Sequence, residues 1–144
     1  MKEWSQGFPI KETPLNTDRD RFEIEQTGPL NIQVEGGGER IWVDGIRYDD
    51  GYLLDAKYVE KPERSPFIDG SNCPDFIRES VKEEVDEEFR RYGAVVNDES
   101  NPVQGLEVIT NEEQAAPYFA DLMGQHNVPG HVVVRSKQAQ EDES

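Results

Sequence analysis

Three residues in the middle of the chain have the types and spacing that phosphoryl-transfer chemistry needs. Asp44 is followed, after ten residues, by the triplet Asp55-Ala56-Lys57. Two carboxylates held close together repel each other unless one is protonated or a cation lies between them. A magnesium ion bound by such a pair keeps several waters, which leaves room for a phosphate oxygen and an attacking water. A neighbouring lysine can position or deprotonate that water and offset developing negative charge.

A β-hairpin is the element that must bring these residues together. Residues 40–48 and 52–59 read as two strands around Asp50-Gly51, a dipeptide typical of two-residue hairpin turns because both central positions need positive φ. A two-residue turn places Asp44 directly opposite Lys57. In this register both aspartates and the lysine lie on one face of the sheet, whereas a slip of one residue would move Asp44 to the other face.

The rest of the chain predicts an α/β fold with a mixed sheet. Alternating apolar residues predict a half-buried strand near 30–34, and Gly36-Gly37-Gly38 reads as a turn. An apolar stripe every three or four residues predicts a long amphipathic helix. The expected order is helix (18–26), strand (30–34), the two hairpin strands, helix (75–92), strand (106–110), helix (116–125) and strand (131–135). We expect Asn16 or Thr17 to cap the first helix, and Asn111 with Gln114 to form a capping box.

Length and charge limit the classes of protein. With 144 residues, we expect an extended lead-in (1–15), one domain (16–136) and a flexible acidic tail (137–144). No apolar run reaches about 18 residues, and the N-terminus lacks the apolar stretch of a signal peptide. The single Cys73 excludes an internal disulfide. The net charge of −16 repels nucleic acid and anionic membranes, so neither would be the first partner to expect from charge alone.

The motif and its flanks resemble those of a known superfamily. Asp44 followed by Asp55-Ala56-Lys57 on a hairpin is similar to the PD-(D/E)xK signature of restriction-endonuclease-like nucleases. The wider stretches 36–45 and 54–59 resemble the restriction-endonuclease-fold toxin domains of bacterial polymorphic toxins, and the similarity extends over residues 22–135. The resemblance implies a three-layer sandwich in which helices flank a mixed central sheet. The proline of the signature is absent, because Val43 precedes Asp44.

The resemblance also implies an activity and site residues. It implies a divalent-metal-dependent endonuclease, a hydrolase with DNA as the expected substrate and RNA as the alternative, and with Mg²⁺ as the metal and Mn²⁺ as the alternative. Asp44 and Asp55 would bind the metal and Lys57 would position or activate water. Glu23, in the first helix before Thr-Gly, is the match for the family's helical Glu or Gln, and Glu25 is the alternative.

The expected substrate contacts and partners complete this prediction. Lys61, Arg90 and Arg91 are the candidate phosphate-binding residues, although the two arginines also suit an ordinary helix end. The chain would be the C-terminal toxic module of a larger secreted or delivered bacterial toxin used in competition. It would act in the cytoplasm of the target cell, insert into no membrane, and meet a cognate immunity protein.

Two other interpretations stay open from the sequence. Asp44-Gly45 is also compatible with a bulge, which would leave Asp55 and Lys57 as an exposed cross-strand ion pair. The whole chain is also compatible with a non-catalytic acidic binding protein, such as an immunity protein or a nucleic-acid mimic, which the charge fits well. Glu107, in the middle of an apolar strand, is expected either in the site or at the sheet edge.

Overall fold

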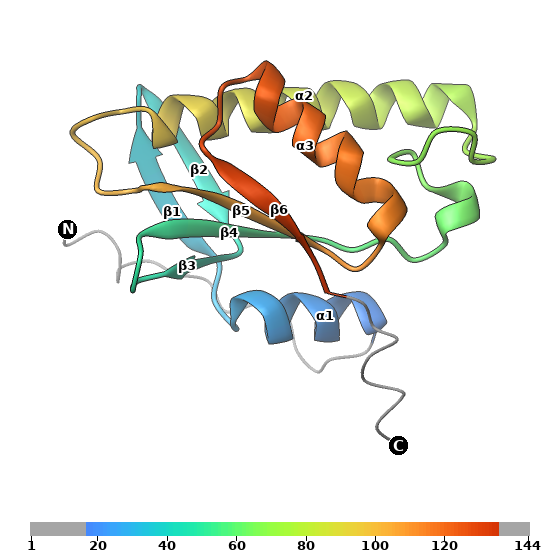
Figure 1. Ribbon diagram of the computed structural model, residues 1–144, viewed down its shortest axis with the longest axis horizontal. Coiled ribbons are helices and arrows are strands. Elements are labelled where there is room, and N and C mark those ends of the chain that lie inside the picture. Colours follow the sequence, from blue (N-terminus) through green and yellow to red (C-terminus); the bar gives the residue numbers. More distant parts are fainter. Residues whose placement is uncertain (1–16, 136–144) are drawn as a thin grey trace.

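Helices cover both faces of a central sheet in the computed structural model, which describes residues 17–135. Helix α1 (Asp18–Thr27) lies on one face, and α2 (Asp75–Val96) and α3 (Ala116–Gln125) lie on the other (Figure 1). This is the three-layer α/β sandwich that the sequence predicts. The expected lead-in (1–15) and acidic tail (137–144) lie outside the described residues.

The central sheet is mixed, as expected. Its strands are β3 (Gly45–Arg47), β4 (Tyr52–Lys57), β5 (Gly105–Thr110) and β6 (Gly130–Val134), in the order β3-β4-β5-β6. The pair β3 and β4 is antiparallel, whereas β4 with β5 and β5 with β6 are parallel. Every residue of β5 is buried, which is usual for a parallel strand covered on both faces.

A second, two-stranded sheet lies beside α2. Strands β1 (Ile32–Gly36) and β2 (Glu39–Val43) form an antiparallel hairpin. Its turn is Gly37-Gly38, with φ of 57° and 83°, which agrees with the turn expected from the glycine run. A Cβ atom at Gly37 would lie 2.3 Å from the carbonyl oxygen of Ala94 in α2, so glycine there also permits close approach of the hairpin to the helix.

The two faces of the sheet bury different apolar clusters. Leu53 and Val108 belong to the main core beneath α2 and α3, which also contains Phe89. Leu54 alternates to the opposite face, where it packs with Phe22 of α1. Residues 53, 55 and 57 of β4 therefore face α2, and residues 54 and 56 face α1.

The helix ends agree partly with expectation. Thr17 caps α1 by accepting a hydrogen bond from the Asp20 amide at 3.1 Å, and α2 continues one turn beyond its predicted end at Tyr92. The capping box expected at Asn111 is wrong. The Asn111 side chain instead bonds both the amide and the carbonyl of Val59, at 2.6 and 2.8 Å, and Glu112 caps the short 3₁₀ turn (Glu113–Ala115) that precedes α3.

The hairpin itself differs from the prediction in two ways. The expected strand 40–48 is two strands, β2 and β3, separated by a bend at Asp44. The turn is a four-residue loop rather than a two-residue one, because the Gly51 amide donates to the Arg47 carbonyl at 2.9 Å. The side chains of Arg47 and Asp50 also form an ion pair at 2.9 Å, which helps to hold the loop in this conformation.

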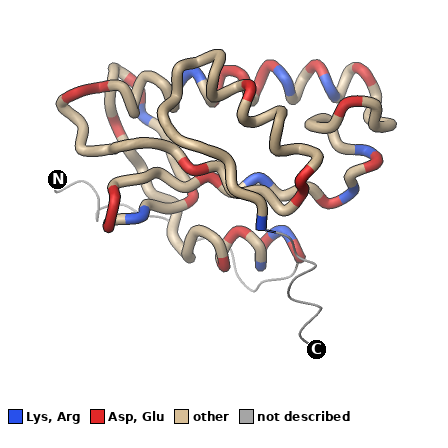
Figure 2. Tube along the Cα trace, viewed as in Figure 1, with Lys and Arg blue, Asp and Glu red and all other residues tan. Residues whose placement is uncertain are grey.

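Acidic side chains are spread over the described chain, on α1, α2 and the connecting loops (Figure 2). Another short 3₁₀ turn (Pro62–Arg64), which carries Glu63 and Arg64, lies between β4 and α2. Within residues 17–135, no helix is both long and apolar enough to cross a membrane.

Candidate active site

The hairpin brings both aspartates and the lysine to the face beneath α2. Gly45 pairs with Leu54, so extending the register by one residue places Asp44 opposite Asp55. The predicted partner of Asp44 was Lys57, and this part of the prediction is wrong because the loop is longer by two residues. A shift of two residues preserves the face on which each side chain lies, so the predicted clustering survives the error.

Asp44 is held by the strand that carries the other two residues. Its amide donates to the Leu54 carbonyl at 3.1 Å, and its Oδ2 accepts a hydrogen bond from the Ala56 amide at 2.8 Å. The carboxylate thus occupies the place of a backbone acceptor where the chain bends between β2 and β3. This anchoring fixes Asp44 directly beside the Asp55-Ala56-Lys57 segment, and it excludes the interpretation of an exposed cross-strand ion pair.

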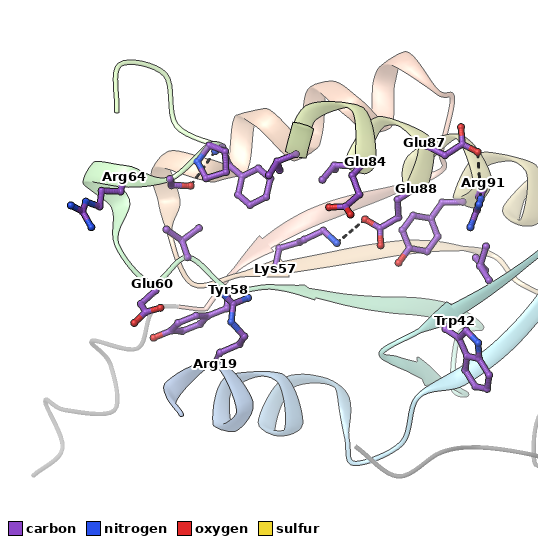
Figure 3. A pocket seen from close by; sticks show the side chains of 18 of the residues that line it. Arg19, Trp42, Lys57, Tyr58, Glu60, Arg64, Glu84, Glu87, Glu88 and Arg91 are labelled. Atoms are coloured by element: carbon purple, nitrogen blue, oxygen red, sulfur yellow. Dashed lines mark hydrogen bonds and ion pairs between the residues drawn. The ribbon is translucent and has the colours of Figure 1, made fainter. Parts of the chain in front are cut away.

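Lys57 lies between two carboxylates, one from the sheet and one from α2. Its ammonium is 2.9 Å from Asp55 Oδ2 and donates a hydrogen bond to Asp55 Oδ1 at 3.2 Å. It also donates to Glu88 Oε1 at 2.8 Å, and Figure 3 shows this bond crossing from the strand to the helix. The side chains of Lys57 and Asp55 are only 15% and 4% exposed, so these contacts form away from bulk solvent.

Burial and neighbouring charges perturb the pKa of all three groups. Burial raises the pKa of Asp55 to about 6; the charge of Lys57 opposes this rise and the charge of Asp44 adds to it. Burial opposes charging Lys57, but Asp55 and Glu88 outweigh it and raise the pKa of Lys57 above its usual value. Burial and the charge of Asp55 raise the pKa of Glu88. Lys57 is therefore a cation at neutral pH in this arrangement.

Glu88 and Tyr92 complete the cluster, and the sequence prediction missed both. Burial raises the pKa of Tyr92 well above its usual value, and the charges of Asp55, Glu88 and Asp44 raise it further, so the phenol lies within reach of these charges. A signal for Glu88 was present. Residues 81, 85, 88 and 92 lie along one line of an α-helix, and a glutamate on that otherwise apolar line needs a buried partner.

The structure separates the other predicted residues. Glu23 lies in α1, on the face of the sheet opposite Asp55 and Lys57, and is half-buried. Its neighbour Glu25 is exposed on the same helix. The contacts described here do not bring Glu23 to the cluster, so its catalytic role stays a prediction.

A cavity of about 900 Å³ opens above Lys57 and Glu88. Lys61 and Arg91 line it, as expected for substrate contacts, whereas Arg90 is not among its lining residues and pairs with Glu87 and Glu39. The other basic residues around the cavity are Arg19, Arg40 and Arg64. Four glutamates, Glu60, Glu84, Glu87 and Glu88, line the cavity as well, so its lining is of mixed charge with a small excess of cations in a molecule of net charge −16.

Glu107 lies away from this site. Its carboxylate accepts hydrogen bonds from Arg47 at 3.1 Å and lies 2.8 Å from His131 Nε2. It alternates along β5 with Leu106 and Val108, which face the main core beneath α2. Glu107 is therefore neither in the site nor at the sheet edge, the two places expected from the sequence: it lies in the internal strand β5 and forms an ion-pair network with Arg47 and His131 on the other face.

The two aspartates provide oxygen donors of the kind that a divalent cation binds. Oδ2 of Asp55 is buried, lies 2.9 Å from the Lys57 ammonium, and has the Asp44 carboxylate as a neighbouring charge. Such oxygen donors suit a hard cation, and magnesium commonly takes only one or two protein carboxylates. No group of three or more His, Cys, Asp or Glu side chains within residues 17–135 is arranged to hold a metal.

The fold and the cluster together define the class of protein. A mixed sheet between helices, with aspartates and a lysine converging on its hairpin, is the architecture of restriction-endonuclease-like proteins. The sequence matches the family described as restriction endonuclease fold toxin 2 over residues 18–129, and the chain belongs to that family. No curated protein matches the chain. Membership implies a nuclease toxin, a hydrolase of nucleic acid.

Proposed function

We propose that this chain is a divalent-metal-dependent endonuclease that hydrolyses phosphodiester bonds in a target cell. The observation that carries the proposal is the buried Lys57 ammonium, held between Asp55 and Glu88 beside Asp44, beneath a cavity lined by cations and glutamates. Burying the ion pair of Lys57 and Asp55 costs free energy, and buried charged groups with perturbed pKa values in a cavity are characteristic of functional sites. Family membership supports the same activity.

Asp44 and Asp55 would hold the metal, with Mg²⁺ as the expected ion and Mn²⁺ as the alternative. When bound, a divalent cation would polarise the phosphate and lower the pKa of a water. The bond from the Ala56 amide orients Asp44, and burial fixes the rotamer of Asp55. These two residues are therefore organised before any ligand arrives, which reduces the entropic cost of assembling the site.

Lys57 would act as a cation and hydrogen-bond donor toward the attacked phosphate. Its raised pKa argues against a role as the base that removes a proton from water in this arrangement. Glu88 would hold the ammonium toward the cavity while the phosphate competes for it. Stabilising charge that develops in the transition state is the role that a fixed, poorly hydrated ammonium performs best.

The biological setting extends the proposal. We expect the chain to be the toxic module of a larger delivered protein and to meet an immunity protein that blocks the cavity. DNA is the expected substrate, on the strength of the resemblance. A non-catalytic acidic binder, the other interpretation, accounts for the net charge but not for the buried lysine and carboxylates.

The test is nucleic-acid cleavage with matched variants. Supercoiled DNA, circular single-stranded DNA and structured RNA are each incubated with the protein and Mg²⁺ or Mn²⁺. We expect cleavage that EDTA abolishes and that Lys57→Ala and Asp55→Asn each reduce by at least about 100-fold. Lys82→Ala, on the exposed face of α2, is the matched control and should cleave normally.

Calorimetry with Mg²⁺ or Mn²⁺ separates metal binding from chemistry. Binding to the unmodified chain that Asp55→Asn removes would support the metal site. A protein that cleaves none of the three substrates in either metal, although folded, would overturn the proposal. Equal cleavage by Lys57→Ala and the unmodified protein would do so as well.

A further inference from the structure

An exposed tryptophan forms part of the cavity wall. Trp42 is 48% exposed on β2, although most large apolar side chains of the described chain are buried. The other exposed large apolar residues of residues 17–135 are Tyr48, Phe76, Ile77 and Val134. None of these lines the cavity above Lys57, whereas Trp42 does. Leaving an indole in water beside a candidate active site costs burial energy that a ligand can recover.

A second aromatic ring lies on the other side of the lysine. Figure 3 shows Tyr58 with Arg19 to one side of Lys57 and Trp42 to the other. The Arg19 guanidinium lies 5.8 Å from the centre of the Tyr58 ring, and Phe22 supports the same ring with centroids 5.5 Å apart. Tyr58 packs in the apolar cluster on the α1 face and carries the Arg19 cation over its ring, so this side of the cavity offers a cation to a phosphate rather than an open ring for stacking.

Few of the basic residues at the opening are available for phosphates. Arg40 is paired with Glu35 at 2.7 Å, and Arg91 lies 3.4 Å from Glu87. Among residues 17–135, Lys61, Arg64 and Arg19 make no ion pair, and the Arg19 guanidinium lies over the Tyr58 ring. Duplex binding depends largely on neutralising many phosphates, so this surface gives little electrostatic hold on a duplex.

The reactive groups also lie below the surface. Lys57 and Asp55 are 15% and 4% exposed, so a phosphate must enter the cavity to reach them. A base pair must first be opened, at a cost of a few kcal/mol, to place a single nucleotide there. A strand that is already unpaired avoids that cost and offers free base faces to Trp42.

We propose, resting on the function proposed above, that the substrate of this site is an unpaired polynucleotide whose bases stack on Trp42. Stacking is nearly independent of charge and of sequence, and it lets a protein with net charge −16 bind a polyanion. Arg19, Lys61 and Arg64 contact the backbone on the Tyr58 side. Single-stranded DNA and unpaired RNA share this chemistry.

Binding is measured without metal, so that it does not depend on cleavage. Labelled oligo(dT), oligo(rU) and a duplex of equal length are titrated with the protein in EDTA and followed by fluorescence anisotropy. In a Trp4→Phe background, Trp42 is the sole tryptophan and reports its own contact with bases. We expect single strands to quench its emission and to bind at least about 10-fold more tightly than the duplex. The two single strands distinguish DNA from RNA.

Two substitutions make the result specific. Trp42→Ala should weaken single-strand binding by about 5-fold to about 100-fold, and Trp42→Phe should lose less because it keeps a ring. Phe76→Ala removes a 77% exposed aromatic residue outside the cavity and should change nothing. A Trp42→Ala protein with unaltered affinity, or a duplex bound as tightly as single strands, would overturn this inference.

The inference and the proposed function fail separately. Single-strand binding that depends on Trp42, without metal-dependent cleavage, would refute the nuclease and keep the binding surface. Cleavage of duplex DNA that depends on Lys57 but not on Trp42 would keep the nuclease and refute the stacking surface.

Discussion

At the scale of single residues, the neighbouring charged side chains of the site differ in how deeply they are buried. Asp55 and Lys57 are two positions apart on one strand and form an ion pair that is almost wholly buried. Glu88 of α2 lies on the other side of the ammonium and is 38% exposed. The lysine is therefore held on both sides, and the aspartates lie where a cation would lower their mutual repulsion.

The pKa of Asp55 gives a direct test in the metal-free protein. It is raised from 3.8 to about 6, so the folded state binds a proton in this range that the unfolded chain has lost. The free energy of unfolding contributed by Asp55 therefore falls as pH rises from about 4 to about 6. NMR titration of the carboxyl carbon should show Asp44→Asn lowering this pKa and Lys57→Met raising it. Shifts in the opposite directions would contradict the assigned neighbours.

Glu88 is expected to act as a positioning residue for Lys57. Glu88→Gln keeps the shape but weakens the hold on the ammonium, and we expect kcat to fall by about 10-fold to about 100-fold with little change in KM. Glu84→Gln is the matched control, because Glu84 lines the same cavity one turn earlier and makes no ion pair with a described residue. A Glu88→Gln protein with full kcat would show that Asp55 alone positions Lys57.

At the scale of elements, the bend between β2 and β3 and the end of α1 decide where Asp44 lies. Gly45 follows the bend directly and is buried against the C-terminal turn of α1. A Cβ atom at Gly45 would lie 2.2 Å from the carbonyl oxygen of Thr27. Only glycine lets β3 approach the helix this closely, and the position of Asp44 follows from that approach.

Gly45→Ala should therefore damage both stability and the site. We expect it to lower the free energy of unfolding by about 1–3 kcal/mol, measured by urea denaturation, and to weaken divalent-ion binding measured by calorimetry. Gly124→Ala is the control, and it is expected to change the free energy of unfolding in the opposite direction. Gly124 lies in α3 with no atom near its missing Cβ, so alanine should stabilise the protein by up to about 1 kcal/mol. Equal stability of the two variants would contradict the close approach.

At the scale of the whole molecule, the net charge repels a polynucleotide, whereas the cations at the cavity opening attract its phosphates. Each phosphate that is neutralised releases counterions, so the salt dependence of binding counts phosphate contacts. Only Arg19, Lys61 and Arg64 are available at the Tyr58 side of the cavity. The field of the remaining acidic surface repels the rest of a polynucleotide.

The affinity for single strands should therefore depend only weakly on salt concentration. Between about 50 mM and about 200 mM NaCl, we expect a slope of log affinity against log salt of about −2 for single strands, from about three phosphate contacts. Arg64→Gln should reduce its magnitude by about 0.7, whereas Lys82→Gln should not change it. Anisotropy titrations in EDTA provide the measurement. A slope as steep as that of proteins with six or more contacts would mean that other cations bind the backbone.

The sequence alone determined most helices and strands of this protein, apart from the break between β2 and β3, and the face on which its acidic pair lies. Alternation along a strand has a period of two, so the common face of Asp44, Asp55 and Lys57 survived a turn longer than predicted. The match of motif and flanks to restriction-endonuclease-fold toxins was also readable, because those residues are local in sequence.

Only the tertiary structure decided the register, the helix that faces the site and the partners of the lysine. Helix α1 packs on the face of Leu54, which separates Glu23 from the cluster, and α2 supplies Glu88 instead. These outcomes depend on which apolar stripe covers which face of the sheet. That choice is made by contacts between residues far apart in the chain, which local periodicity does not encode.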